Sequence, residues 1–259
     1  MTLGFPHVSD IRLTKAPLAE VVCQVRFPAI LRIDKESPSD FQEAVRRRFP
    51  VFEVEQGVQL RLPSPLVAAA SEAQMTPRLY RFRTADGESF ITVTADSYAL
   101  TTNRYTVWDE FAHDLQLAHD AMQQVYELPF STRIGLRYVN VFLPSQTGYE
   151  TLAELGQLLR SELTCLLSVD AWSTPKELLT QILLEDEEGN LTMRVGAKAK
   201  DDSSEPVLFL DLDYFEEGQL PTQGLIERCQ RYHDTIYDAF RWCVRADQLA
   251  IFEPVEGSC

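Results

Sequence analysis

The stretch TRIGLRYVNVFL, residues 132–143, reads as the clearest β-strand of this chain. It is rich in β-branched and aromatic residues, which favour strands, and successive side chains of a strand point to opposite faces. One face carries Arg133 and Arg137, and the other carries Leu136 and Tyr138. We expect the apolar face to pack against a helix and the two arginines to lie on the other side of the sheet.

The same order of elements is found before and after the start of this strand. The first part predicts a strand at 17–27, a helix at 39–49, strands at 58–69, 78–84, 89–95 and 98–103, and a long helix at 106–128. The second part predicts the strand at 132–143, a helix at 150–167, strands at 177–186, 191–199 and 206–215, and a long helix at 222–244.

The two long helices share a short motif. HDAMQQVY at 119–126 falls at the same place as HDTIYDAF at 233–240. Together with the shared order of elements, this match indicates an internal duplication. The sequence therefore predicts an α+β protein of two tightly fused units, 1–130 and 131–259. Each has the order strand, helix, three to four strands and long helix, with antiparallel sheets and a pseudo-twofold relationship.

Composition limits the classes of partner. The chain has 259 residues, of which 45% are hydrophobic, so it can bury a large core. It carries 39 acidic and 24 basic residues, a net charge of -15, which disfavours binding to duplex DNA. The five cysteines show no paired spacing, and neither a signal peptide nor a long apolar run is visible. We expect a cytoplasmic protein with reduced thiols and no membrane association.

The predicted order of elements resembles the fold of the TATA-box-binding protein and of helix-grip proteins, in which an antiparallel sheet curls around a long helix. The first resemblance implies a concave sheet that holds DNA, which the acidity of this chain disfavours. The second implies an apolar ligand cavity between sheet and helix. Likeness of fold alone does not choose between these functions.

Three stretches are similar to signature sequences of an uncharacterised, sporadically distributed bacterial family of about this length. They are APLAEVVCQVRF near the start, FITVTADSYALTTNRYTVWDEF in the middle and RIGLRYVNVF after it. The resemblance implies no catalytic residue. The sporadic distribution implies a gene context such as a mobile defence or toxin–antitoxin-like locus.

Arginines on the predicted strands are the first candidate site. A guanidinium group binds carboxylate or phosphate in two-point geometry, so several on one face of a sheet could bind an anionic or protein partner. The alternative is that Arg133 and Arg137 pair with Glu20, Asp211 or Asp213 across strands. The predicted partner-binding residues are Arg26, Arg81, Arg83, Arg133 and Arg137.

Histidines of the long helices are the second candidate. His119 and His233 lie on apolar stripes, which favours either core histidines held by a hydrogen bond or polar contacts in a ligand cavity. His113 and His119 are six residues apart, which does not suit a helical metal pair. Asp211 and Asp213 would share a strand face, as alternating acids on the wet side of a sheet also do. We predict no metal site.

The sequence predicts a non-enzymatic protein that binds a macromolecular partner, with a regulatory or antitoxin-like role. A protein partner is expected, and a homodimer is left open. No nucleophile elbow, phosphate loop or dinucleotide fingerprint is present, so we predict no catalytic residue and no cofactor. A helix-grip-type small-molecule binder is the alternative, and a metal-dependent hydrolase centred on Asp211 and Asp213 is a weaker one.

Overall fold

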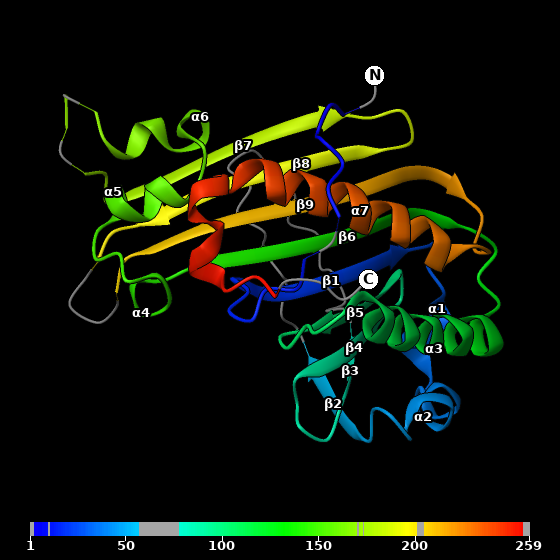
Figure 1. Cartoon of the computed structure of the whole chain (residues 1–259). Helices are drawn as coiled ribbons and strands as arrows, with labels where there is room; N and C mark the ends of the chain where they lie inside the picture. Colours follow the sequence, from blue (N-terminus) through cyan, green and yellow to red (C-terminus); the bar gives the residue numbers. More distant parts are fainter. Residues whose placement is uncertain are drawn as a thin grey trace.

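A single nine-stranded antiparallel sheet forms the frame of the protein (Figure 1). The computed structural model describes residues 3–9, 11–56, 78–169, 171–172, 174–200 and 205–255. The strands are β1 (Leu18–Arg26), β2 (Val51–Gln56), β3 (Arg78–Arg83), β4 (Ser89–Thr94), β5 (Ser97–Thr102), β6 (Ser131–Phe142), β7 (Glu177–Glu185), β8 (Asn190–Lys198) and β9 (Val207–Leu220). They lie side by side in the order β2-β3-β4-β5-β1-β6-β9-β8-β7.

The strand β6 that opened the sequence analysis lies inside the sheet, between β1 and β9. Its alternation is confirmed: Ile134, Leu136 and Tyr138 are buried, while Arg133 and Arg137 on the other face are half-buried. Residues 1–130 supply β1 to β5 and residues 131–259 supply β6 to β9. The antiparallel β1–β6 pair therefore joins the strands of the two predicted units into one continuous sheet.

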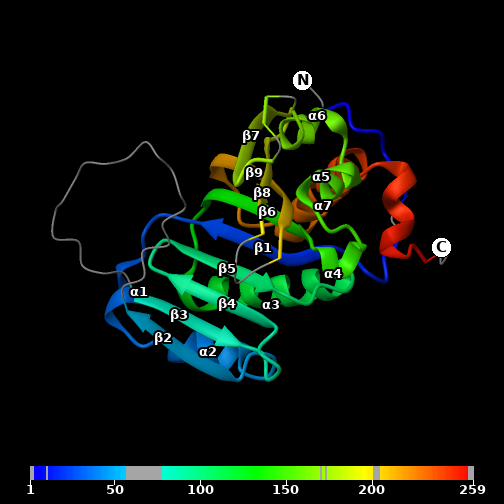
Figure 2. The same cartoon turned by 90° about the vertical axis from the view of Figure 1, so that its left-hand side faces the viewer.

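Two long helices, α3 (Trp108–Tyr126) and α7 (Leu225–Cys243), lie on one face of the sheet (Figure 1). The shorter helices are α1 (Leu31–Lys35), α2 (Ser39–Val45), α4 (Pro144–Thr147), α5 (Leu152–Leu155) and α6 (Ser161–Thr164), with 3₁₀ turns at Gly156–Leu158, Cys165–Leu167 and Ala246–Phe252. Figure 2 shows α2 beside the β2–β3 end of the sheet and α5 near the β8–β9 end. The α+β class predicted from the sequence is confirmed.

The core lies between the sheet and the apolar stripes of the long helices. Leu115 and Met122 of α3 and Ile236 of α7 are fully buried, as the helical spacing of apolar residues predicts. Cys23 on β1 and Cys229 on α7 are also buried, with their Sγ atoms 3.7 Å apart. α7, from the second half of the chain, therefore packs on a strand from the first half.

The helix predicted at 150–167 is wrong as a single element. α5 begins at a capping box between Thr151 and Glu154 and passes into a 3₁₀ turn at Gly156, a residue with low helix propensity. Leu159 is then extended and forms a β-bridge with Val244. This bridge joins the segment to the end of α7, and a continuous helix could not form it.

The first half contains a strand that the sequence analysis did not assign. β2 (Val51–Gln56) pairs with β3 at one edge of the sheet and exposes Val51, Phe52 and Val54. The strand predicted at 58–69 lies outside the described residues. Within the described part of the chain, no helix combines the length and the apolar character needed to cross a membrane.

Candidate ligand pocket and the arginine face

The five predicted partner-binding arginines share one face of the sheet. Arg83 on β3 leads in register across β4, β5 and β1 to Arg137 on β6. Arg26 lies directly opposite Arg133 on the neighbouring strand, and Arg81 shares a face with Arg83 because the two are separated by one residue. Four strand spacings separate β3 from β6, which places the two ends of the set about 19 Å apart. This face is turned away from α3 and α7.

The arginines of β6 are bound by acids of the neighbouring strand. Arg137 donates to the two carboxylate oxygens of Asp211 at 2.7 and 2.9 Å, and Arg194 donates to the same group at 2.9 Å. Arg133 lies 3.1 Å from Asp213. The hydrogen bonds with Asp211 raise the pKa of Arg137, while burial raises the pKa of Asp213. The alternative expected from the sequence, pairing across strands with Asp211 and Asp213, is confirmed.

Several arginines of this face also pack on aromatic rings of the same sheet. The guanidinium carbon of Arg133 lies 4.6 Å from the centre of the Phe215 ring. A Cβ atom on Gly135 would come within 2.5 Å of an Arg133 nitrogen, so only glycine leaves room for this side chain. Arg81 and Arg83 lie over the Phe90 ring at 5.0 and 5.4 Å. The set of arginines therefore contacts its own sheet at both ends.

Glu53 and Arg26 are more exposed than the β6 arginines of this face. Arg83 pairs with Glu53 at 3.2 Å, and both side chains are partly exposed. Arg26 is exposed at the end of β1. Of the predicted set, Arg26 is therefore the residue best placed to meet a partner without first giving up a packed position.

His119 occupies a closed site in the first half. Its Nδ1 atom lies 2.7 Å from the Tyr98 hydroxyl, and both side chains are buried. Burial lowers the pKa of His119, which favours the neutral ring. This is a core histidine held by a hydrogen bond, one of the two roles expected from the sequence.

His233 forms a similar pair in a different setting. Its Nδ1 atom lies 2.7 Å from the Tyr138 hydroxyl, and its ring stacks on Trp108 with centroids 4.8 Å apart and planes 12° apart. The Tyr138 hydroxyl also approaches that of Tyr105 at 3.4 Å. These rings come from β6, α3, α7 and the loop before α3, and together they form one wall of a cavity.

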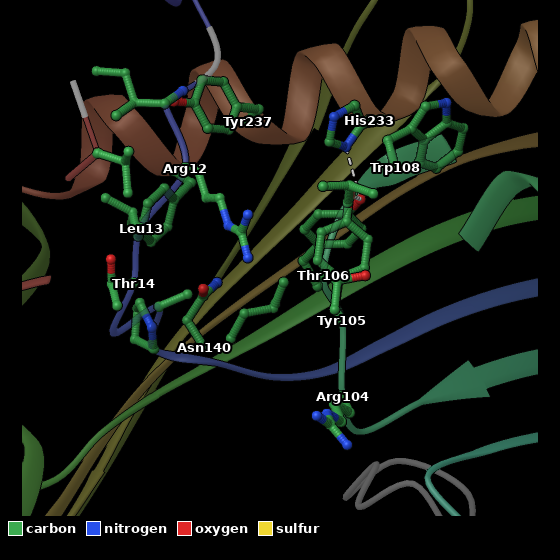
Figure 3. Close-up of a pocket in the computed structure, with 18 of the residues that line it drawn as sticks. Arg12, Leu13, Thr14, Arg104, Tyr105, Thr106, Trp108, Asn140, His233 and Tyr237 are labelled. Carbon is green, nitrogen blue, oxygen red and sulfur yellow. Dashed lines mark hydrogen bonds between the residues drawn. The ribbon is translucent and has the colours of Figure 1, made fainter. Parts of the chain in front are cut away.

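The cavity has a volume of about 580 Å³ and lies on the helix side of the sheet (Figure 3). This falls within the range of about 300–1,000 Å³ typical of small-molecule sites. The wall opposite the rings is the segment 11–18, which runs past the end of α7. His233 lines this cavity and His119 does not.

Backbone pairing fixes the segment 11–18 as a wall. The Ile11 amide donates to the Tyr237 hydroxyl at 2.8 Å. The amides of Thr14 and Lys15 donate to carbonyls at 252–253 at 3.1 Å, and the Val255 amide donates to the Arg12 carbonyl at 2.8 Å. Two segments that are remote in sequence therefore hold each other over the cavity, and Tyr237 ties them to α7.

Two arginines are the charged groups of the cavity lining. Figure 3 shows the Arg12 side chain extending from the segment 11–18 into the space beside Thr106, with Arg104 at the lower rim. Neither arginine makes an ion pair with another described residue, and no described carboxylate lines the cavity. Asn140 from β6 adds a buried amide to the lining.

Sequence reasoning missed Arg12, and it did not assign Arg104 to the cavity that the helix-grip-type alternative expects. Arg12 stands in a short polar stretch without strand or helix periodicity, so no local pattern marks it as a site residue. Tyr105 and Trp108 lie in the stretch FITVTADSYALTTNRYTVWDEF, which shows no sign of a ligand site. Their position at the cavity depends on the fold of the segment 11–18, which lies about ninety residues away in sequence.

Asp211 and Asp213, the residues of the weaker hydrolase alternative, hold arginines through their carboxylate oxygens. Across the described ranges, no group of three or more His, Cys, Asp and Glu side chains is arranged to hold a metal ion.

A comparison with protein-family models found no match to this chain, and a comparison with curated proteins found none either.

Proposed function

We propose that the protein binds a small molecule in the cavity between β6, α7 and the segment 11–18. The observation that carries this proposal is the cavity of about 580 Å³ whose wall contains the hydrogen-bonded pair Tyr138–His233. Mostly apolar and aromatic walls with a few fixed polar groups are typical of ligand sites. This is the helix-grip-type alternative of the sequence analysis, with His233 as the polar contact.

The polar groups of the cavity are held in place before any ligand arrives. The Tyr138 hydroxyl is fixed by His233, and the ring of His233 is fixed by its stack on Trp108. The Nδ2 atom of Asn140 donates to the Leu210 carbonyl at 3.3 Å, which leaves its oxygen as an acceptor. Prior ordering of this kind lowers the conformational entropy that the protein must lose when a ligand binds.

Native mass spectrometry tests the proposal. The protein is incubated with a bacterial metabolite extract, desalted under non-denaturing conditions and measured beside Thr106→Trp, which places a large ring at the cavity wall. Thr106 is exposed, so we expect this variant to fold normally. The expected result is a bound mass on the unsubstituted protein that Thr106→Trp lacks. Equal adducts on both proteins, or none on either, would contradict the proposal.

The partner-binding role of the arginine face is the second candidate. The observation that favours it is that all five predicted residues share one face of the sheet, away from the long helices. Arg26→Glu is the variant to use in a pull-down, because Arg26 is exposed and its loss leaves no buried acid unpaired. Loss of a captured protein with unchanged thermal stability would support this role, and unchanged capture would oppose it.

We also propose that the two halves of the chain arose by internal duplication, with units at 1–130 and 131–259 related by a pseudo-twofold axis. The strand order supports this idea, because β1 and β6 meet at the centre and each is followed outward by the last strand of its own unit. Each unit also has a 19-residue helix on the same face of the sheet, α3 in the first and α7 in the second.

A further inference from the structure

The charge of the cavity lining is opposite to that of the chain as a whole. The protein has a net charge of -15. The described lining nevertheless contains Arg12 and Arg104 and no carboxylate. Of the two guanidinium groups, that of Arg12 extends into the cavity space (Figure 3). A local excess of positive charge in a partly enclosed site attracts an anion more strongly than the same charge in open solvent.

Several other arginines of this protein bind an acid of the same chain. Arg137 and Arg194 share Asp211, Arg133 pairs with Asp213, and Arg48 binds the buried Asp114 through three contacts of 2.9 to 3.1 Å. Arg12 and Arg104 have no such partner among the described residues, so their donors remain available to a ligand.

The aromatic rings limit the remainder of the ligand. Tyr105, Tyr138 and Trp108 line the same cavity as the two arginines. Rings of this kind pack best against planar or apolar groups. An aromatic site could instead hold an organic cation, but two unpaired guanidinium groups would repel it. The lining therefore combines an anion site with a ring site.

We propose that the cavity takes an anionic ligand that carries a planar apolar ring, with the anion at Arg12, the charge of Arg104 at the rim, and the ring against Tyr105 and Trp108. This inference rests on the proposed function and names the ligand class of the same site. Carboxylate, sulfonate and phosphate share the chemistry that a guanidinium group recognises. The proposal commits to that shared chemistry.

Two fluorescent probes with the same ring system distinguish ligand binding in the cavity from selection of anions by its arginines. Anilinonaphthalene sulfonate carries one negative charge, and N-phenylnaphthylamine carries none; both brighten in apolar sites. Each is titrated into the unsubstituted protein, Thr106→Trp, Arg12→Gln, Arg104→Gln and the control Arg47→Gln. Arg47 is an exposed arginine just after α2, which lies beside the β2–β3 end of the sheet and outside the cavity lining.

The expected result is binding of both probes that Thr106→Trp abolishes. Arg12→Gln should weaken the sulfonate by about tenfold, since a hydrogen bond to a charged group contributes about that factor, and Arg104→Gln at the rim should weaken it by less. They should leave the neutral probe within about twofold, and Arg47→Gln should change neither. The affinity for the sulfonate should also fall as sodium chloride is raised, while that for the neutral probe should not.

Two other outcomes overturn the inference, and each has a different meaning. If Thr106→Trp abolishes both probes but Arg12→Gln and Arg104→Gln leave the sulfonate unchanged, the cavity binds ligands without selecting anions. The proposed function then survives and the inference does not. If Thr106→Trp leaves both probes bound, they sit elsewhere, for example on the exposed Leu179 and Leu183 of β7, and both claims fail.

Discussion

The two faces of strand β6 carry polar groups that are satisfied in different ways. On one face, Arg133 and Arg137 are bound by acids of the adjacent strand β9. On the other face, Tyr138 and Asn140 border a cavity beside α7. The charged face is the more noticeable in the sequence, yet its charges are neutralised within the fold. A candidate site is marked by polar groups that can still bind a ligand, rather than by charge itself.

Removal of Asp211 should cause the largest loss of stability. Its buried carboxylate holds Arg137 and Arg194, so Asp211→Ala removes three hydrogen bonds to charged groups and leaves two cations close together. We expect a loss of about 3 kcal/mol in the free energy of unfolding, measured by urea denaturation. Asp213→Ala is the matched control, since Asp213 is less buried than Asp211 and hydrogen-bonds to one arginine in place of two.

Comparing the stability losses of the two variants tests whether Asp211 organises the arginine face. Asp213→Ala should cost clearly less than Asp211→Ala, and neither should alter probe binding in the cavity on the opposite face. Equal losses for the two variants would show that the arginine face is not organised around Asp211.

Removal of the tyrosine hydroxyl should lower the free energy of unfolding by different amounts in the two Tyr–His pairs. Tyr98→Phe leaves the buried His119 ring without its partner, which should cost about 1–2 kcal/mol. Tyr138→Phe should cost less than about 1 kcal/mol, because water in the cavity can replace the hydroxyl beside His233. Thermal and urea unfolding measure both. A larger loss for Tyr138→Phe would mean that water does not reach His233.

Acid should destabilise the fold through His119. Burial holds the pKa of His119 below its ordinary value of 6.5, so the unfolded chain takes up a proton more readily than the folded one. This contribution is fully present above about pH 6.5 and is lost as the pH falls below it. The midpoint temperature of thermal unfolding should fall as the pH is lowered from about 7.5 to about 5.5. His119→Gln should show a smaller drop, and an equal drop would assign the effect to other groups.

Arg26→Gln should have the smallest effect on stability. Arg26 is exposed at the end of β1, and substitutions at such positions usually change the free energy of unfolding by less than about 0.5 kcal/mol. Arg137→Gln provides the comparison, because it leaves the buried Asp211 with one arginine in place of two. Similar losses for both would show that burial does not distinguish the two ends of the arginine face.

Local patterns predicted the elements that carry strong periodicity. β6, α3 and α7 were found because alternation or helical spacing runs through each of them, and their buried faces are the ones expected. The helix at 150–167 was predicted wrongly because its leucines suit a helix, whereas Leu159 is used in a bridge to Val244. Nothing local in the sequence reveals that bridge.

The candidate site depended on contacts that no local pattern carries. His233 was singled out because it lies on an apolar stripe, and the structure places it at the cavity. Arg12 was missed because its role follows from the pairing of the segment 11–18 with residues 252–255. The arginines of β6 could be assigned to one face of a strand, but the strand that supplies their acids was fixed only by the β6–β9 register.

The buried contact between Cys23 and Cys229 allows opening of the core to be followed by the reaction of a thiol. The thiols of Cys23 on β1 and Cys229 on α7 touch inside the core. Their hydrogen bond, together with burial, raises the pKa of Cys229, which makes it a poor nucleophile while the chain is folded. Exposed Cys165 should react with an alkylating reagent at once. The later reaction of Cys229 then measures how often α7 lifts from the strands beneath it.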